Sequence, residues 1–210
     1  MFIVLEGVEG AGKSTQARLL SQWIEGFGAA VVMTREPGGT PVGEAIRGIV
    51  LDRGNLTMPA ETELFLILGA RAAFTQEVVR PALASGKVVL ADRFDLSTFA
   101  YQGFGRGLDL AKVREANAFA TGGIKPDISL ILDLPVEEGL ARKGGGQDGD
   151  RIEKEGVAFL SRVLDGYRAL AEQDDTARLI PAQGTPEEVQ GLLRRALSDA
   201  FPETFSFDEV

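Results

Sequence analysis

Residues 7–15 carry the side chains best suited to chemistry in this sequence. They are Gly7, Val8, Glu9, Gly10, Ala11, Gly12, Lys13, Ser14 and Thr15, and residues 7–14 have the spacing G-x-x-x-x-G-K-[ST] of a phosphate-binding loop. Glycines let backbone N–H groups approach phosphate oxygens, while the Lys13 ammonium reaches the terminal phosphates and the Ser14 hydroxyl ligates Mg²⁺. The loop therefore predicts a site for a nucleoside triphosphate.

The segments on either side of this loop predict the elements that must position it. Apolar residues 2–5 have the length and β-branched content of a buried parallel strand, and residues 14–27 show the apolar period of a helix. The alternative is a glycine-rich turn that precedes Lys13 and Ser14 by chance. Strand, loop and helix in this order favour the phosphate site, because the helix N-terminus adds free N–H groups and a positive dipole end.

Asp92 and Arg93 follow a second apolar run, residues 87–91, which predicts another buried strand. A carboxylate at the end of such a strand is suited to hold Mg²⁺, often through water, and Asp92 is the candidate. A helix N-cap is the alternative for Asp92. Arg93 favours the metal site, because an arginine beside the phosphates can hold a second anion by a bidentate contact.

A glycine-rich segment, residues 143–150, lies between Arg142 and Arg151. Its composition predicts a flexible lid over approximately residues 142–154, in which the two arginines close over the phosphates and neutralise charge in the transition state. A surface loop with two solvated arginines is the alternative. The neighbouring phosphate loop favours the lid.

Composition narrows the chemistry further. The chain has 210 residues, 44% hydrophobic and 25% charged, with no cysteine and no histidine. Disulfides, thiol nucleophiles and imidazole bases are therefore excluded, and carboxylates, Lys, Arg and Mg²⁺ remain, which suits phosphoryl transfer. The net charge of −9 argues against nucleic-acid binding. We find no apolar run that would span a membrane and no cleavage-type signal, and we expect a cytoplasmic protein.

Strand-like and helix-like segments alternate along the chain, which predicts an α/β fold with a mostly parallel sheet between helices. We expect one domain over residues 1–210, Pro81 to bend or end a long helix, and no regular structure in the tail, residues 201–210. The expected strands are 2–5, 29–33, 87–91, 128–132 and 178–180, and the expected helices are 14–27, 42–51, 61–83, one from 97, 110–121, 136–142, 154–173 and 186–200.

Five sequence blocks together point to one family. They are the loop at 7–14, T-R-E-P-G-G-T at 34–40, D-R-F at 92–94, S-T-F-A-Y-Q-G at 97–103 and D-R-I-E at 150–153. In this order and spacing they resemble bacterial thymidylate kinase over roughly residues 2–200. The resemblance implies a three-layer P-loop NTPase fold, transfer of the γ-phosphate of ATP to dTMP with Mg²⁺, and a homodimer.

The resemblance also implies how the acceptor phosphate and sugar are held. Arg93 and Arg47 match arginines that hold the dTMP phosphate. Arg35 and Glu36 match positions that line the monophosphate pocket, with Glu36 near the metal or arginine side chains. Tyr101 matches the aromatic residue packed under the sugar, which favours deoxyribose.

Further residues match positions around the base and the donor nucleotide. Arg71 matches the arginine that donates to thymine O4, and Thr98 and Gln102 match polar contacts to the base edge. Arg142 matches the arginine that lies on adenine, and Gln183 falls in the turn at 181–184 that wraps the adenine edge.

Four residues are implied to be catalytic: Lys13, Arg93, Arg151 and Glu9. Glu9 matches the acidic residue that faces the acceptor's 3′-hydroxyl and phosphate. Gly10 stands where some members have an arginine, so the catalytic arginine is expected from the lid, as Arg151. The acceptor phosphate is already ionised at neutral pH, so the attack needs no general base.

Ile67 departs from the family pattern, which has a phenylalanine here that stacks on thymine. Phe65 lies on roughly the opposite helix face and cannot replace it. We expect weaker dTMP binding than in a Phe-bearing relative, or compensation by another aromatic residue such as Phe94.

Two other functions share the phosphate loop. A GTPase-like switch would need an N-K-x-D stretch, which this sequence lacks. Kinases of other small acceptors, including other nucleotides, deoxynucleosides and shikimate, are not expected to carry the 34–40 and 97–103 blocks together.

Overall fold

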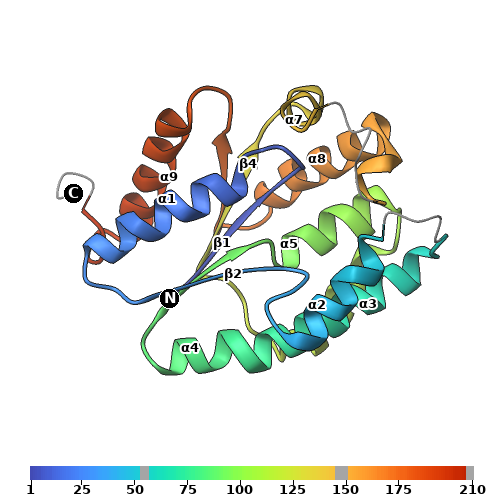
Figure 1. Ribbon diagram of the computed structural model, residues 1–210, viewed down its shortest axis with the longest axis horizontal. Helices are drawn as coiled ribbons and strands as arrows, with labels where there is room; N and C mark the ends of the chain where they lie inside the picture. The colour runs from blue at the N-terminus through green and yellow to red at the C-terminus, as the bar shows by residue number, and fades with distance from the viewer. Residues whose placement is uncertain (53–56, 145–150, 207–210) are drawn as a thin grey trace.

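A computed structural model describes residues 1–52, 57–144 and 151–206 (Figure 1). The described part of the chain contains one sheet of five strands, β1 (Phe2–Gly7), β2 (Val31–Arg35), β3 (Val88–Asp92), β4 (Ile128–Asp133) and β5 (Ala177–Pro181). Their order is β2-β3-β1-β4-β5, and each neighbouring pair is parallel. The predicted parallel α/β architecture is confirmed.

The strand register brings distant residues to one edge of the sheet. Asp92 lies opposite Leu5 on one side and opposite Arg35 on the other, and Gly7 lies opposite Leu132. In open parallel sheets the carboxyl ends of the strands form the ligand crevice where the strand order changes direction. Here that position is the end of β1, where the phosphate loop begins.

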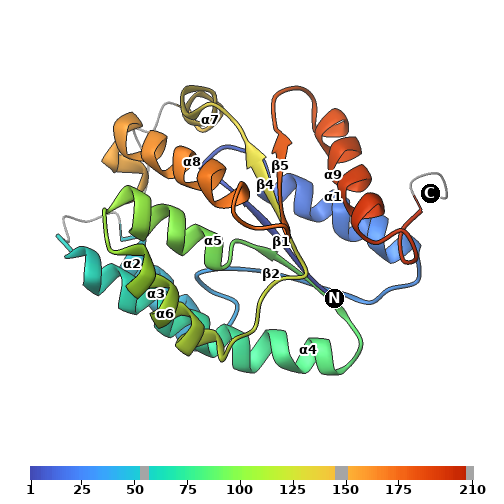
Figure 2. The ribbon, with the colours of Figure 1, turned by 180° about the vertical axis from the view of Figure 1, so that it is seen from behind.

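Helices cover both faces of the sheet (Figures 1 and 2). Alternate residues of β1 point to opposite faces: Ile3 and Leu5 pack with α1 and α9, whereas Phe2 and Val4 pack with Phe74. The α-helices are α1 (Lys13–Gly26), α2 (Pro41–Val50), α3 (Ala60–Phe74), α4 (Arg80–Ala84), α5 (Asp95–Thr98), α6 (Leu110–Thr121), α7 (Val136–Arg142), α8 (Val157–Ala171) and α9 (Pro186–Ala200). Within the described ranges, two π-helical stretches, η1 (Thr75–Val79) and η2 (Phe99–Gly105), and one 3₁₀ turn, η3 (Glu153–Glu155), lie between these helices.

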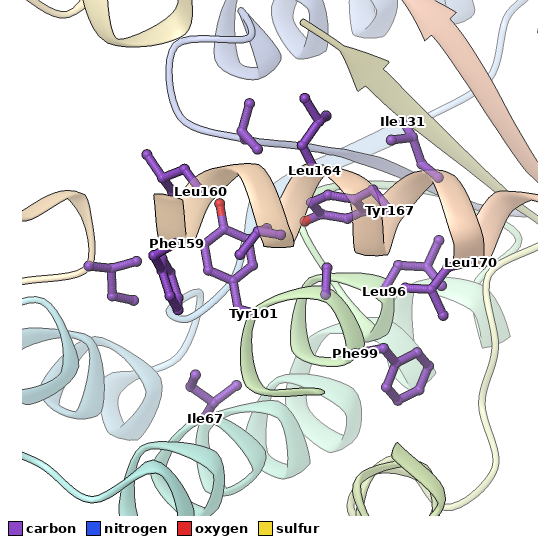
Figure 3. Packing of buried hydrophobic residues seen from close by; sticks show 14 of the residues in the cluster. Ile67, Leu96, Phe99, Tyr101, Ile131, Phe159, Leu160, Leu164, Tyr167 and Leu170 are labelled. Atoms are coloured by element: carbon purple, nitrogen blue, oxygen red, sulfur yellow. The ribbon is translucent and has the colours of Figure 1, made fainter. Parts of the chain in front are cut away.

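Helix α8 packs against the segment α5–η2 near the carboxyl end of the sheet. Figure 3 shows Phe159 and Tyr167 of α8 directed toward Tyr101 of η2. The Tyr101 ring centroid lies 6.2 Å from that of Phe159 and 6.3 Å from that of Tyr167, both edge-to-face. This apolar packing holds two tyrosine hydroxyls near the carboxyl end of β1.

Most predicted helices are confirmed, three of them at the predicted bounds: 110–121, 136–142 and 186–200. The pattern predicted at 61–83 is helical but not uniform, because a π-helical stretch precedes α4 and Pro81 lies at the start of that helix. A proline cannot donate to the preceding turn and its ring crowds the carbonyl four residues back, and the wider π turn accommodates both. The helix predicted from residue 154 begins at Val157, after Gly156 with φ of 85°.

The predicted strands are found with shifted ends. The strand expected at 29–33 runs from Val31 to Arg35, where it pairs with β3 as far as Asp92. The tail has no helix or strand through residue 206, as predicted, but it is not free of the core. Phe205 is buried, with its ring 5.3 Å from Trp23 and 5.5 Å from Phe27. Residues 145–150 of the predicted lid and 207–210 of the tail lie outside the described residues.

Candidate functional site

A cavity of about 680 Å³ opens at the carboxyl end of the sheet. One part, which we call the loop side, is lined by residues 10–16 together with Arg142 and residues 182 and 184–186. The other part, the arginine side, is lined by Arg35, Glu36, Arg47, Ile67, Arg71, Arg93, Thr98, Tyr101 and Gln102. Glu9 and Asp92 line the cavity between the two. The structure thus brings together most of the residues that the sequence singled out.

The phosphate loop is held by its own lysine. Lys13 Nζ donates to the carbonyl oxygens of Gly7 at 2.9 Å and Val8 at 3.0 Å, so these two residues form the loop wall rather than the cavity lining. Gly10 has φ of 74°, and a Cβ there would lie 2.0 Å from the carbonyl oxygen of Gly139. Burial, and then the positive charge of Arg93, lower the pKa of Lys13 to about 8.

Ser14 and Asp92 form an oxygen pair beside this loop. Ser14 Oγ donates to Asp92 Oδ2 across 3.1 Å. Among residues 1–52, 57–144 and 151–206 no three acidic, histidine or cysteine side chains cluster as a metal site. Two protein oxygens fit Mg²⁺, which usually keeps several waters and takes further oxygens from substrate phosphates. The alternative of a helix N-cap at Asp92 is wrong, because Phe94 precedes α5 and no side chain caps that helix.

Arg93 stands where the two sides meet. Its backbone has φ of 77°, a left-handed conformation that costs a non-glycine residue about 1 kcal/mol or more. Its Nη2 donates to Glu9 Oε1 at 2.8 Å and to the Tyr101 hydroxyl at 3.1 Å. Burial would raise the pKa of Glu9, but Arg93 and Lys13 outweigh it and hold that pKa below its usual range. Glu9 is therefore an ionised partner that keeps Arg93 at the cavity.

A second layer behind Arg93 was not predicted from the sequence. Arg93 Nη1 donates to the Ser97 hydroxyl at 3.1 Å and the Tyr167 hydroxyl at 3.2 Å. Both hydroxyls bond to Glu6, which is 0% exposed and also accepts from the backbone N–H of Phe94 at 2.9 Å. A glutamate inside an apolar strand was the available signal, because a buried carboxylate must have partners.

Arg71 is the centre of the arginine side. It is 1% exposed, and its Nε donates to Glu36 Oε2 at 2.7 Å. Its Nη1 donates to Thr98 Oγ1 at 2.7 Å and Asn117 Oδ1 at 2.8 Å, while Nη2 donates to the Phe94 carbonyl at 2.8 Å. Four of the five guanidinium N–H groups are thus engaged, which leaves one on Nη2. Asn117 was not predicted.

Glu36, which accepts from Arg71 through Oε2, is only partly hydrogen-bonded. Its Oε1 is buried without a hydrogen-bond partner among the described residues. Burial raises the pKa of Glu36 to about 7, although Arg71 acts in the opposite direction. A buried acceptor without a partner beside the cavity is suited to a donor supplied by a ligand or by water.

The base-stacking position is apolar but not aromatic. Ile67 lines the cavity, whereas Phe65 is 67% exposed. Phe94 lies beneath the Arg71 guanidinium, whose carbon is 5.1 Å from the ring centroid, and it packs on Phe2. Because Phe94 does not line the cavity, the prediction that it compensates for Ile67 is wrong.

Two further arginines line the entrance of the arginine side. Arg35 Nη2 lies 3.2 Å from the Glu44 carboxylate in an exposed pair, and Arg47 Nη1 donates to the Pro37 carbonyl at 2.9 Å. Helix α2 carries Arg47 and Glu44, and Thr40 caps its N-terminus by accepting from Gly43 N–H at 2.9 Å. The 34–40 block therefore acts as a shaped turn that presents these side chains.

Of the two residues predicted at the far rim of the loop side, Arg142 lines the cavity and Gln183 does not. Arg142 Nη2 donates to the Ala182 carbonyl at 3.2 Å, which joins the end of α7 to the turn after β5. Gln183 bonds to Glu138 and does not line the cavity, although its neighbours Ala182 and Gly184 do.

Arg151 is not at the phosphate loop. Its Nε donates to the Val50 carbonyl at 3.0 Å and its Nη2 to the Glu63 carboxylate, and it does not line the cavity. The prediction that Arg151 acts on the phosphates is not tested by this position. Glu63, which holds it, was not singled out by the sequence.

Comparison with known proteins decides the family. The family model described as thymidylate kinase matches residues 5–192. The chain belongs to the thymidylate kinase family. It is 51% identical over 181 residues to a thymidylate kinase of Desulforudis audaxviator, covering 86% of this chain and 81% of that protein. It is 45% identical over 205 residues to one of Desulfovibrio desulfuricans, covering 94% of each.

A solved structure of this family has the same fold. The crystal structure of thymidylate kinase from Ehrlichia chaffeensis superposes with a TM-score of 0.78 at 28% sequence identity, covering 94% of this chain and 98% of that one. In the described part of the chain, no helix has the length and apolar character needed to traverse a lipid bilayer.

Proposed function

We propose that this chain, as a single catalytic domain, transfers the γ-phosphate of ATP to dTMP to give dTDP and ADP. The family membership and one geometric observation support this function. A single cavity joins the phosphate loop to a pocket lined by Arg35, Arg47, Arg71 and Arg93. Two anionic nucleotides in line require this combination, because transfer depends on alignment and on neutralising charge. A GTPase-like switch is not favoured, since the sequence has no N-K-x-D stretch.

The loop side is proposed to hold ATP. The N–H groups of the loop cradle the phosphates, and Lys13 turns from its carbonyl partners to the terminal phosphates. Ser14 and Asp92 would hold Mg²⁺, which neutralises phosphate charge when bound. Arg142 and the turn at 181–184, with Gln183 at its edge, are proposed to enclose adenine.

The arginine side is proposed to hold dTMP. Arg93, Arg47 and Arg35 are assigned to its phosphate, with Glu36 beside them. Arg71, Thr98 and Gln102 are assigned to the polar edge of thymine, and Ile67 to its face. Tyr101 lies under the sugar and Glu9 near its 3′-hydroxyl.

Transfer needs no general base, because the attacking phosphate oxygen of dTMP is ionised at neutral pH. Lys13 and Arg93 lower the repulsion between the two nucleotides and keep their phosphates in line. Arg151 is proposed to leave Glu63 and neutralise charge on the transferred phosphoryl group, as arginine fingers do.

We further propose a cytoplasmic homodimer that binds no nucleic acid. Exposed aromatic side chains on neighbouring helices support an interface: Phe65 of α3 is 67% exposed and Phe119 of α6 is 92% exposed. Analytical ultracentrifugation tests this assignment. Dissociation of Phe65→Ser/Phe119→Ser to monomers is the expected result, and a monomeric unmodified protein would contradict it.

The proposed reaction is tested by coupled ADP release with a panel of acceptors. The panel contains dTMP, dUMP, dCMP, thymidine, shikimate and a control with no acceptor. We expect the highest kcat/KM with dTMP and negligible release without an acceptor. Release that is independent of acceptor would indicate a switch NTPase, and a preference for thymidine or shikimate would indicate a kinase of another acceptor.

A further inference from the structure

The side-chain amide of Gln102 has a fixed orientation. Its Nε2 donates to Glu63 Oε1 at 2.7 Å. Gln102 is buried, and it lines the arginine side of the cavity. A carboxylate only accepts hydrogen bonds, so a half-turn of the amide would bring Gln102 Oε1 against a second acceptor. The amide oxygen therefore occupies the position away from Glu63.

Glu63 itself is held firmly in the ionised form. It is 1% exposed and accepts from Arg106 through Nε at 3.2 Å and Nη2 at 3.0 Å, as well as from Arg151. Burial alone would raise the pKa of Glu63, but the hydrogen bonds from Arg106, Gln102 and Arg151 outweigh it and lower that pKa. Because both Arg106 contacts remain when Arg151 leaves Glu63 in the proposed transfer, Glu63 stays an acceptor behind Gln102.

The neighbouring groups offer hydrogen bonds of the opposite sense. Thr98 Oγ1 accepts from Arg71 Nη1 at 2.7 Å, so its own proton is available to a ligand, and Arg71 retains one N–H on Nη2. The arginine side therefore presents donors from Thr98 and Arg71 and an acceptor from Gln102. A pyrimidine imide edge, with a carbonyl oxygen beside a ring N–H, complements this set. Cytosine has an amino group beside a ring acceptor and opposes it.

We propose that Glu63, without touching the substrate, selects an imide base over cytosine by holding Gln102 with its amide oxygen toward the base. Glu63 is therefore a positioning residue for specificity. This inference rests on the proposed placement of the acceptor base against Gln102.

Glu63→Gln tests the inference by steady-state kinetics with dTMP, dUMP and dCMP. Arg106 Nη2 and Arg151 Nη2 both donate to Glu63 Oε2, so the oxygen of the introduced amide keeps that position. Its NH₂ then takes the place of Oε1, where it faces Gln102 as well as Arg106 Nε and turns the Gln102 amide around. One reversed hydrogen bond predicts that the dCMP-to-dTMP ratio of kcat/KM rises by about 10- to 100-fold, with dUMP falling alongside dTMP. An unchanged ratio in the folded variant would overturn the proposal.

Glu155→Gln is the matched control, because Glu155 bonds the same Arg106 at 2.6 Å but is not a partner of Gln102. Its base preference should equal that of the unmodified enzyme. An equal shift in Glu155→Gln and Glu63→Gln would mean that loss of charge around Arg106 is the cause, and the proposal would be wrong.

The exchanged pair Glu63→Gln/Gln102→Glu supplies a rescue. The amide introduced at position 63 can donate to one oxygen of the carboxylate introduced at position 102, whose other oxygen again accepts at the base. The dTMP preference should return to within about threefold of the original, well inside the value of one hydrogen bond. Failure of the folded double variant to regain it would count against orientation as the mechanism.

Two measurements separate this inference from the placement on which it rests, and they remain informative if Glu63→Gln does not fold. Gln102→Ala should lower kcat/KM for dTMP, and no effect would overturn both the placement and the inference. With the unmodified enzyme, 3-methyl-dTMP, which lacks the ring N–H, should lose about 10-fold or more in kcat/KM. Equal use of both substrates would show that no acceptor reads that position and would overturn the inference alone.

Discussion

The loop side and the arginine side of the cavity are stabilised by different kinds of atoms. On the loop side, apart from Ser14 with Asp92, the polar contacts described run to backbone carbonyls: Lys13 donates to Gly7 and Val8, and Arg142 donates to Ala182. On the arginine side the two buried arginines are held mainly by other side chains, as in Arg71 with Glu36 and Arg93 with Glu9. Backbone atoms are present whatever the residue type, whereas each side-chain partner depends on one residue. We therefore expect the arginine side to be more sensitive to single substitutions that leave the loop intact.

The largest effect is expected at Arg151, which is bonded to Glu63 near the arginine side but is proposed to act on the phosphates at the loop side. Arg151→Ala should lower kcat by about 10³-fold and leave the KM for dTMP nearly unchanged, because charge is neutralised only in transfer. Stopped-flow or steady-state ADP release measures both constants. Arg162→Ala is the control, since Arg162 bonds the Gly105 carbonyl and does not line the cavity. An unchanged kcat in Arg151→Ala would remove this residue from catalysis.

Two arginine–glutamate pairs on the arginine side differ in burial, and their loss should therefore lower the free energy of unfolding by different amounts. Arg71→Met leaves Glu36 buried without its partner, and we expect a loss of about 3–5 kcal/mol in the free energy of unfolding. Arg35→Met breaks the exposed pair with Glu44 and should cost about 0–1 kcal/mol. Urea unfolding at pH 8 measures both, because Glu36 of the unmodified protein, with its pKa of about 7, is mostly ionised there and loses a charged partner in Arg71→Met. Equal losses would mean that burial does not distinguish the pairs.

The loop side should show its own pH dependence through Lys13. Its pKa is lowered to about 8, so the charged form predominates below pH 8 and is lost above it. We expect kcat/KM for ATP to fall by about tenfold per pH unit above pH 8, since this constant reports the free enzyme. The decline in kcat should occur at higher pH, because bound phosphates favour charged Lys13. A flat kcat/KM profile between pH 7 and pH 10 would contradict the assignment.

Ile67→Phe should have the smallest effect, and it tests whether the base lies on residue 67 of the arginine side. An aromatic ring at this position adds a stacking contribution of about 0.5–1.5 kcal/mol, which corresponds to about 2- to 10-fold tighter dTMP binding. Calorimetric titration with dTMP measures it. Phe65→Ile, on the same helix but outside the cavity, keeps an apolar side chain at the proposed dimer interface and should leave the affinity unchanged. If Ile67→Phe binds no tighter, the base does not lie on residue 67.

A short sequence pattern was enough to predict those features whose physical cause lies within a few neighbouring residues. The phosphate loop is contiguous, and its flanking strand and helix have their own periodicity, so the site for phosphate and the parallel α/β architecture were both predictable. The 34–40 and 97–103 blocks pointed to the family for the same reason. Helix ends near Pro81 and Gly156 were less predictable, because their backbone conformations depend on the turn beyond each residue.

The sequence by itself therefore determined which groups can bind phosphate and in what type of fold, since these follow from residue type and short spacing. Only the tertiary structure decided which partners those groups have. Tyr167 and Glu6 are hydrogen-bonded across 161 positions, Arg93 and Glu9 across 84, and Gln102 and Glu63 across 39. Hydrogen bonds require contact within about 3 Å, and contact between distant positions follows from the packing of the whole chain.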